Sequence, residues 1–186
     1  RSTPKPSSAA SDVYKRQDIY YGNNDGDGHG THVAGTVGGK MIGVASESYI
    51  MGVKIFDDTG YGTYSMLVIA IDAAKEAVFN LQDEGIPSIY SMSLSGPKSS
   101  SLNRNIASLV KSNIITVAAA GNDGVSASTV SPASEQEAIT VMASTANDGI
   151  MQDSNFGGDI FAPGERIKSA SNLRADKYLQ LSGTSM

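Results

Sequence analysis

The chain contains only two histidines, and both lie in one glycine-rich segment, residues 23–36. Because histidine titrates near neutral pH, this segment is the first place to look for acid-base or metal chemistry. A metal site finds little support, since no glutamate separates His29 from His32 and the chain offers no third histidine. The acidic first half has the pattern of a calcium loop, but its twelfth position, which should be glutamate, is Ala34.

The same segment does not fit a dinucleotide site, because its glycines do not follow an apolar strand. Small residues at Gly30, Ala34 and Gly35 predict a helix with one face stripped of bulk, which can pack closely against another element. Such packing leaves His29 at the helix start, with its imidazole able to reach another segment. For an isolated histidine a packing or loop role is the default, so the elements and motifs around it must decide.

Strand and helix patterns alternate through the middle of the chain. Apolar runs typical of buried strands occupy residues 49–56, 86–94, 114–120 and 138–143. Apolar residues at helical spacing predict one helix over residues 65–83, with Ser65 as N-cap and Gly85 as its end, and another around residues 102–110. Continuous apolar strands joined by helices indicate an α/β fold with three layers, a mostly parallel sheet covered by helices on both faces. Sites in such folds lie beyond the carboxyl ends of the strands.

Composition excludes several classes of function. Nineteen acidic against fourteen basic side chains give a formal net charge of -5, which does not support binding to nucleic acid or to an anionic membrane surface. The longest apolar stretch, residues 66–81, is interrupted by charges, so we expect a soluble protein with no membrane span. The absence of cysteine excludes disulfides and thiolate metal sites. The length of 186 residues suits one domain, which we place at residues 18–186, with residues 1–17 set aside as a non-domain or artefactual segment.

Three motifs, in order, carry a resemblance to a known family. The segment HGTHVAGT at 29–36 resembles the catalytic-histidine motif of the subtilisin-like serine proteases. AAAGN at 118–122 resembles the strand and asparagine of their oxyanion site, and FAPG at 161–164 followed by GTSM at 183–186 resembles the segment around their nucleophile. SPASE at 131–135 is similar to the proteinase K branch. The resemblance covers residues 18–186 and implies a partial, subtilisin-like peptidase domain, truncated at both ends.

The resemblance implies a serine endopeptidase that hydrolyses peptide bonds by a Ser-His-Asp mechanism. Ser185 would be the nucleophile, and His29 would take its proton and later give it to the leaving amine. Asn122 would donate a hydrogen bond to the tetrahedral oxyanion, together with the backbone N–H of Ser185. Without the family match, Ser185 would be taken as a turn serine, and Asn122 equally as part of an Asn-Asp-Gly turn.

The resemblance also implies how a substrate binds. Two backbone segments would clamp an extended peptide by β-augmentation, and their residues are Gly60, Gly62, Ser93, Leu94, Ser95 and Gly96. Ala119, Ala120 and Gly121 would line the main specificity pocket, where their small size favours large apolar side chains. Tyr64 would close a second apolar pocket, and Ser95 departs from the glycine that is usual at its position.

No cofactor is required for this chemistry, but a structural calcium ion is conceivable. Asp159 matches the acidic calcium ligand of the proteinase K branch, with backbone carbonyls of Gln136 and Ala138 as partners, although a simple turn carboxylate explains Asp159 as well. The family resemblance implies peptide or protein substrates and a monomer. It further implies a location outside the cell, in the secretory pathway or in a vacuole.

Two parts of the family pattern are not found in the chain. No Asp-Thr-Gly or Asp-Ser-Gly turn follows an apolar strand ahead of His29, and neither Asp25 nor Asp27 fits the third triad position, nor do Asp12 and Asp18. The helix that should begin at the nucleophile is also expected to lie beyond the last residue. We therefore expect these 186 residues to be inactive alone.

Two rival interpretations belong to other classes. A non-catalytic homologue that only binds peptides is opposed by the retained His29, Asn122 and Ser185. A nucleotide-binding α/β domain predicts a phosphate loop after the first strand, where the sequence has two aspartates at 57–58.

Overall fold

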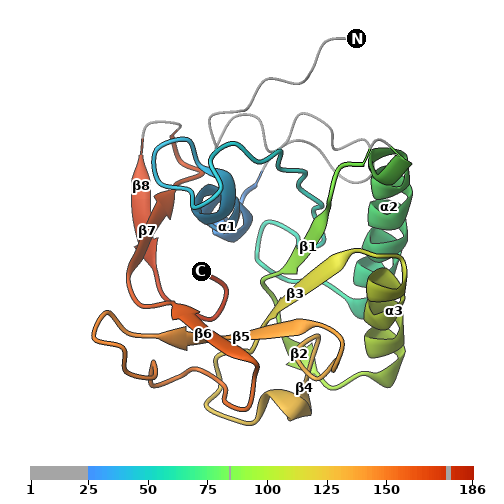
Figure 1. Cartoon of the computed structure of the whole chain (residues 1–186). Helices are drawn as coiled ribbons and strands as arrows, with labels where there is room; N and C mark the ends of the chain where they lie inside the picture. The colour runs from blue at the N-terminus through green and yellow to red at the C-terminus, as the bar shows by residue number, and fades with distance from the viewer. Residues whose placement is uncertain (1–24, 84, 175–176) are drawn as a thin grey trace. The chain divides into compact units, whose positions relative to one another are not determined.

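The computed structural model describes residues 25–83, 85–174 and 177–186, and its elements are labelled in Figure 1. They form two compact units, which we describe separately. Unit 1 comprises the described residues up to Thr63 together with Arg166–Leu181, and unit 2 comprises Tyr64–Glu165 and Ser182–Met186. The segment 1–17, predicted to lie outside the domain, falls outside the described residues.

Unit 2 is built on a four-stranded parallel sheet with the order β1-β3-β5-β6. Its strands are β1 (Ile89–Met92), β3 (Ile115–Ala119), β5 (Ile139–Ser144) and β6 (Ile160–Pro163). Met92 pairs with Ala118 and Ala119 pairs with Val141, so the carboxyl ends of neighbouring strands lie at one edge of the sheet. The parallel arrangement confirms the sequence prediction, and it places the segments that follow these strands together.

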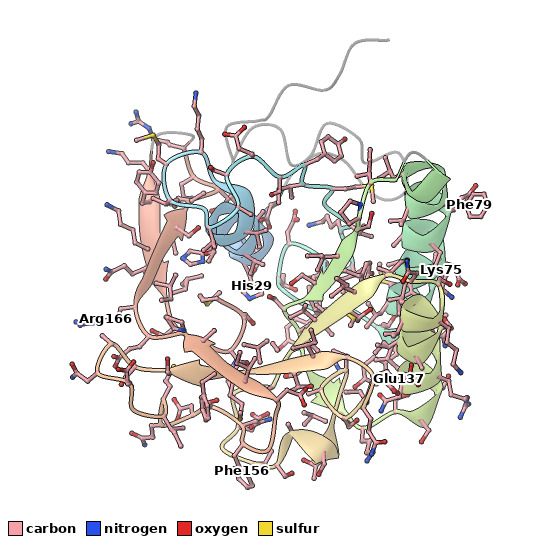
Figure 2. The ribbon with its side chains drawn as sticks, viewed as in Figure 1. His29, Lys75, Phe79, Glu137, Phe156 and Arg166 are labelled. Atoms are coloured by element: carbon pink, nitrogen blue, oxygen red, sulfur yellow. The ribbon has the colours of Figure 1, made fainter. Side chains whose placement is uncertain are left out.

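Two helices of unit 2, α2 (Tyr64–Asp83) and α3 (Ser100–Lys111), lie side by side, and α3 also contacts β3 (Figure 1). Both predicted apolar faces are confirmed for the members that are buried: Leu67, Ile71, Ala74, Val78, Leu102, Ile106 and Leu109. Leu81 and Val110, predicted to belong to the same faces, are only half-buried. The opposite face of α2 is open, and Phe79 points outward from it (Figure 2).

The ends of these helices are set by local backbone chemistry. Helix α3 begins after Ser99, whose hydroxyl oxygen accepts a hydrogen bond from the backbone N–H of Leu102 at 3.2 Å. Helix α2 begins at Tyr64, so Ser65 lies within its first turn and the prediction of Ser65 as N-cap is wrong. Gly85 has a positive φ of 74° and is followed by a bond from the Ile86 N–H to the Leu81 carbonyl, which confirms the predicted helix end.

A short antiparallel pair completes unit 2. Strand β2 (Gly96–Pro97) pairs with β4 (Val130–Ser131), which follows the 3-10 helix η1 (Ala127–Thr129). One end of the segment predicted to bind peptide is therefore anchored, because Gly96 pairs with Ser131.

Unit 1 packs helix α1 (His29–Gly38) against β7 (Ile167–Ala170), which pairs antiparallel with β8 (Tyr178–Leu181). The contact is close at Gly35, where an added Cβ would lie 2.5 Å from Ser169 Oγ and 2.9 Å from Ala170 Cβ. Ser169 Oγ donates to the carbonyl of His32 at 2.7 Å. The predicted packing face is thus confirmed at Ala34 and Gly35, which are buried, but Gly30 is exposed and does not belong to it.

Sequence patterns misplaced several strands. Residues 49–56 do not form a strand, because no ladder partner for their backbone exists among the described residues, and apolar composition alone cannot supply one. The strand predicted at 86–94 is shorter in the structure, where β1 covers Ile89–Met92. Pro87, which has no N–H to donate, lies before its start. Strand β6 was missed because this edge strand has three exposed residues of four and ends in proline. In the part of the chain that is described, no helix has both the length and the apolar character to cross a bilayer.

Candidate active site

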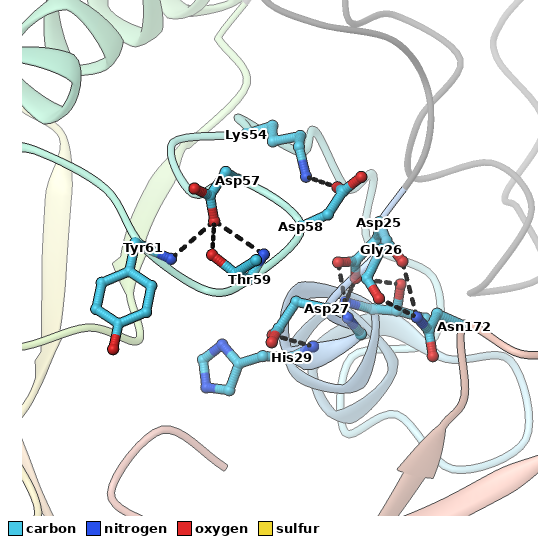
Figure 3. Close-up of polar contacts among 12 residues, drawn as sticks. Asp25, Gly26, Asp27, His29, Lys54, Asp57, Asp58, Thr59, Tyr61 and Asn172 are labelled. Atoms are coloured by element: carbon cyan, nitrogen blue, oxygen red, sulfur yellow. Dashed lines mark hydrogen bonds and ion pairs between the residues drawn. The ribbon is translucent and has the colours of Figure 1, made fainter.

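His29 is the first residue of α1, and two carboxylates hold the start of this helix (Figure 3). Asp27 Oδ2 accepts the His29 N–H at 3.1 Å, while Asp25 accepts the N–H groups of Gly28 and Thr31, both at 2.8 Å. The first turn of a helix has N–H groups with no partner inside the helix, and negative charge is favourable there. These carboxylates therefore fix the backbone from which the His29 imidazole projects.

This capping explains two residues that sequence reasoning left without a role. The sequence does not favour Asp25 or Asp27 as the third triad member, and in the structure backbone N–H groups at the helix start donate to their carboxylates. The Asp-x-Asp pattern just before a helix was the available signal. Asn172, after β7, donates to the carbonyl of Asp25 at 2.8 Å and so ties the same loop to the hairpin.

The surroundings of His29 favour its neutral form. Burial lowers the pKa of His29 below the ordinary histidine value, and the nearby Asp27 carboxylate opposes this effect by raising it. A neutral imidazole is the form that can accept a proton from a nucleophile.

The loop predicted to bind peptide at Gly60 and Gly62 is held by a single carboxylate (Figure 3). Asp57 Oδ1 accepts from Thr59 Oγ1 at 2.6 Å and from the N–H groups of Thr59 and Tyr61 at 2.8 and 3.1 Å. The Asp57 N–H also donates to the Tyr61 carbonyl at 2.9 Å. These hydrogen bonds, that from the Thr59 side chain first, lower the pKa of Asp57, so the turn is fixed by an ionised carboxylate.

In unit 2 the C-terminal segment lies at the carboxyl edge of the sheet. The Gly183 N–H donates to the carbonyl of Gly164, the residue after β6, at 2.8 Å. Ser93 Oγ, directly after β1, donates to the backbone carbonyl of Ser185 at 2.8 Å. Ser185 is therefore placed by strands that are distant in sequence, at the edge where the sequence predicted a site.

Thr184 connects Ser185 to Asn122. Asn122 Oδ1 accepts both the backbone N–H and the hydroxyl of Thr184, at 2.9 and 3.1 Å. The same hydroxyl accepts the Gly121 N–H at 3.0 Å, and Thr184 is buried. Since the amide oxygen of Asn122 is occupied twice, the orientation of the amide is fixed, with Nδ2 at its opposite end. The structure thus brings together two of the three predicted catalytic residues within unit 2.

Tyr64 lies against one predicted peptide-binding segment. Its hydroxyl donates to the backbone carbonyl of Pro97, and a Cβ at Gly96 would lie 2.5 Å from the hydroxyl oxygen. Burial raises the pKa of Tyr64, so it stays a neutral donor. Leu94 and Ser95 lie between β1 and β2.

The small residues at the end of β3 and directly after it are mostly enclosed. Ala119 and Ala120 are 6% and 0% exposed, and Ala120 packs with Ala127, Ala133 and Met142. The Ala120 side chain is therefore part of the core of unit 2. A pocket of about 490 Å³, which the sequence did not indicate, opens next to Asn122, and its lining includes Met151, Asp153, Glu165 and Ser182.

Asp159 is placed by β5. Its Oδ2 accepts the Thr140 N–H at 2.7 Å, and its own N–H donates to the Thr140 carbonyl at 2.8 Å. Within the described residues, no group of three or more histidines and carboxylates could hold a metal ion. Any cation here would depend on one carboxylate and on backbone oxygens.

Comparison with known proteins decides the family. The model of the subtilase family, peptidase S8, matches residues 2–186. The chain belongs to the subtilase family. This membership agrees with the three sequence motifs, and similarity to fungal proteases supports the resemblance to the proteinase K branch.

Two subtilase relatives are fungal proteases. The cuticle-degrading protease of Metarhizium anisopliae is 44% identical over 168 residues, covering 88% of this chain and 42% of the relative. Proteinase T of Parengyodontium album is 42% identical over 167 residues, covering 88% of this chain and 56% of the relative. The chain thus spans about half the length of these relatives.

A solved structure confirms the predicted fold. The crystal structure of a cold adapted subtilisin-like serine proteinase matches with a TM-score of 0.81 at 36% identity, covering 91% of this chain and 60% of that protein. The α/β, subtilisin-like fold class predicted from the sequence is therefore correct.

Proposed function

We propose that the full-length protein containing this subtilase chain is a serine endopeptidase. Ser185 Oγ attacks the peptide carbonyl carbon while His29 accepts the hydroxyl proton, and the tetrahedral oxyanion accepts hydrogen bonds from Asn122 Nδ2 and the Ser185 N–H. His29 then gives the proton to the leaving amine, and water hydrolyses the acyl-enzyme by the same steps in reverse. The observation that carries the proposal is the pair of bonds from Thr184, the residue before the proposed nucleophile, to Asn122 Oδ1, which leaves Nδ2 as the donor end of the amide.

The proposed substrate is an extended peptide or protein with a large apolar side chain next to the cleaved bond. Two observations support the extended binding mode: the turn at Asp57 fixes the backbone around Gly60, and the Tyr64 hydroxyl bonds to the strand that contains Gly96. The apolar preference rests on the family resemblance. A relative named for degrading cuticle supports an extracellular location. We further propose that the protein acts as a monomer and needs no cofactor for the chemistry.

The test is turnover by the full-length protein. It should hydrolyse an apolar peptide anilide, Ser185→Ala should abolish hydrolysis, and a serine-directed phosphonate should label Ser185. Asn122→Ala should lower kcat by about 100-fold or more with little change in KM. Ser101→Ala, at an exposed position of α3, is the control and should leave kcat unchanged. Peptide binding without labelling or turnover would instead support the non-catalytic homologue.

We also propose that these 186 residues alone do not turn over substrate. Asp25 and Asp27 hold the helix backbone, so they do not supply the carboxylate that orients the imidazole. Hydrolysis of the peptide anilide by the purified chain, lost in Ser185→Ala, would contradict this.

A weak calcium site at Asp159 is a further part of the proposal. One oxygen of Asp159 is engaged by Thr140, and the other could bind calcium with carbonyls of Gln136 and Ala138 and water, a donor set of the hard oxygen type that calcium prefers. The bound ion would stabilise the fold and take no part in the reaction. Addition of calcium should raise Tm in the full-length protein, and Asp159→Asn should remove this increase.

A further inference from the structure

Asn155 is a fully buried side chain whose polar contacts all go to one loop, residues 120–125, which we call the oxyanion loop. Its Oδ1 accepts the N–H groups of Asp123 and Val125, each at 3.0 Å. Its Nδ2 donates to the carbonyl of Ala120 at 2.8 Å. One amide therefore bonds the loop on both sides of Asn122.

The orientation of the Asn155 amide follows from its partners. Two backbone N–H groups require an acceptor and one carbonyl requires a donor, so only one placement of oxygen and nitrogen satisfies all three. Removing this side chain leaves three backbone groups of the loop without this partner: the Ala120 carbonyl in a buried position, where an unpaired polar group is costly, and the Asp123 and Val125 N–H groups in part-buried positions.

The backbone around Asn155 supports the same loop. The Asn155 N–H donates to the Gly121 carbonyl at 2.9 Å, the Gly124 N–H donates to the Asp153 carbonyl at 3.1 Å, and the Phe156 N–H donates to the Val125 carbonyl at 3.1 Å. Phe156 contributes by its backbone, because its side chain is 54% exposed and points outward (Figure 2).

Gly121 permits the close approach of the two segments. Its φ of 101° is positive, and a Cβ at this position would lie 2.4 Å from Asn155 Nδ2. The loop and Asn155 thus fit each other only with glycine here.

We propose that Asn155 is a positioning residue for the reaction. It fixes the backbone on either side of Asn122, whereas Thr184 fixes the Asn122 side chain, so Nδ2 is held in place before the oxyanion forms. Asn155 itself is buried and does not touch the substrate, so it acts through Asn122. The inference rests on the proposed serine peptidase function.

The test uses Asn155→Ala in the full-length protein, with kcat normalised by phosphonate titration of folded sites. We expect kcat to fall by about 10-fold or more with a change in KM below about 3-fold, because the effect is on transition-state binding. A peptide boronate, which forms a tetrahedral adduct, should lose affinity by the same factor as kcat/KM, whereas binding of a plain peptide to the Ser185→Ala protein should change little.

A double-mutant cycle separates positioning from general damage. In an Asn122→Ala background, Asn155→Ala should lower kcat by less than about 3-fold, since its route of action is already removed. Leu109→Ala, at a buried position of α3, is the control. It should lower Tm without the selective fall in kcat that is expected for Asn155→Ala. An equal loss of kcat in both backgrounds, or an unchanged boronate affinity, would overturn the inference.

Hydrogen exchange keeps the inference testable if the proposed function fails. In the Ser185→Ala protein, Asn155→Ala should speed exchange of the Asp123 and Val125 N–H groups by about 10-fold or more, because both groups lose their acceptor. Absence of turnover in the wild type would refute the proposed function alone. Unchanged exchange at these two groups would refute the role of Asn155 alone.

Discussion

Replacing Gly35 with alanine is expected to destabilise unit 1, although alanine is the better helix former. Gly35 lies in α1 where the helix meets β7, and a Cβ there would lie 2.5 Å from Ser169 Oγ and 3.0 Å from the backbone nitrogen of Ala170. Unstrained carbon contacts need about 3.5–4.0 Å. Either α1 moves away from β7, or Ser169 turns aside and breaks its bond to the His32 carbonyl.

Opposing contributions give the size of the effect. Exchange of glycine for alanine within a helix gains about 1 kcal/mol from propensity. Overpacking costs about 1–3 kcal/mol. The buried Ser169 hydroxyl, left without its acceptor if it turns aside, costs about 1–3 kcal/mol more. The two costs together therefore outweigh the gain from helix propensity, and we expect a net loss of roughly 1–5 kcal/mol in the free energy of unfolding.

Thermal and urea unfolding of the full-length protein measure this loss. For a domain of this size each 1 kcal/mol corresponds to about 2–4 °C in Tm. Gly30→Ala is the matched control, because Gly30 lies in the same helix but is exposed, and it should gain up to about 1 kcal/mol. A Gly35→Ala protein as stable as the wild type would refute the close-packing argument.

Three further predictions concern other parts of the chain. Asp27→Asn removes the charge that raises the pKa of His29, so the acidic limb of the pH profile of kcat/KM should move to lower pH; movement to higher pH would contradict the assignment. Ser99→Ala removes the N-cap of α3 and should lower the free energy of unfolding by about 1 kcal/mol, as measured by urea titration; Ser101→Ala should cost less. Asp57→Ala should raise KM for an extended peptide more than Asp57→Asn, which retains an acceptor oxygen, and equal KM values for the two variants would argue against the turn as their cause.

Much of the fold could be predicted because its signals are local. The buried face of α3 repeats with helical spacing, and the apolar runs behind β3 and β5 correspond to central strands. The run at 49–56 has the same composition, yet it forms no strand, because strand formation depends on a partner elsewhere in the chain. In contrast, β6 forms a strand that the sequence does not predict, because three of its four residues are exposed and it lacks the apolar pattern of a buried strand.

Residues that would take part in the reaction can be predicted from sequence motifs. Residues that only hold those residues in place cannot. Motifs predict His29, Asn122 and Ser185 as catalytic residues, and in the structure Asn122 bonds to Thr184, the residue next to Ser185. Asn155 gave no signal, because a single asparagine between serine and phenylalanine looks like a turn, and its partners precede it by about thirty residues. Only three-dimensional contacts reveal a group that acts on another part of the chain.

Unit 1 is formed by two segments that are far apart in the sequence, so it cannot be completed until both have been synthesised. The contact between His32 Nε2 and the Ile167 carbonyl joins residues separated by 135 positions. At about 5–20 residues per second, α1 leaves the ribosome roughly 7–27 s before its partner strand has been made. During that interval Tyr64–Glu165, which lies wholly between them, can fold first. The packing of α1, the helix that carries His29, against β7 is thus completed late, after most of the framework around Asn122 has been translated.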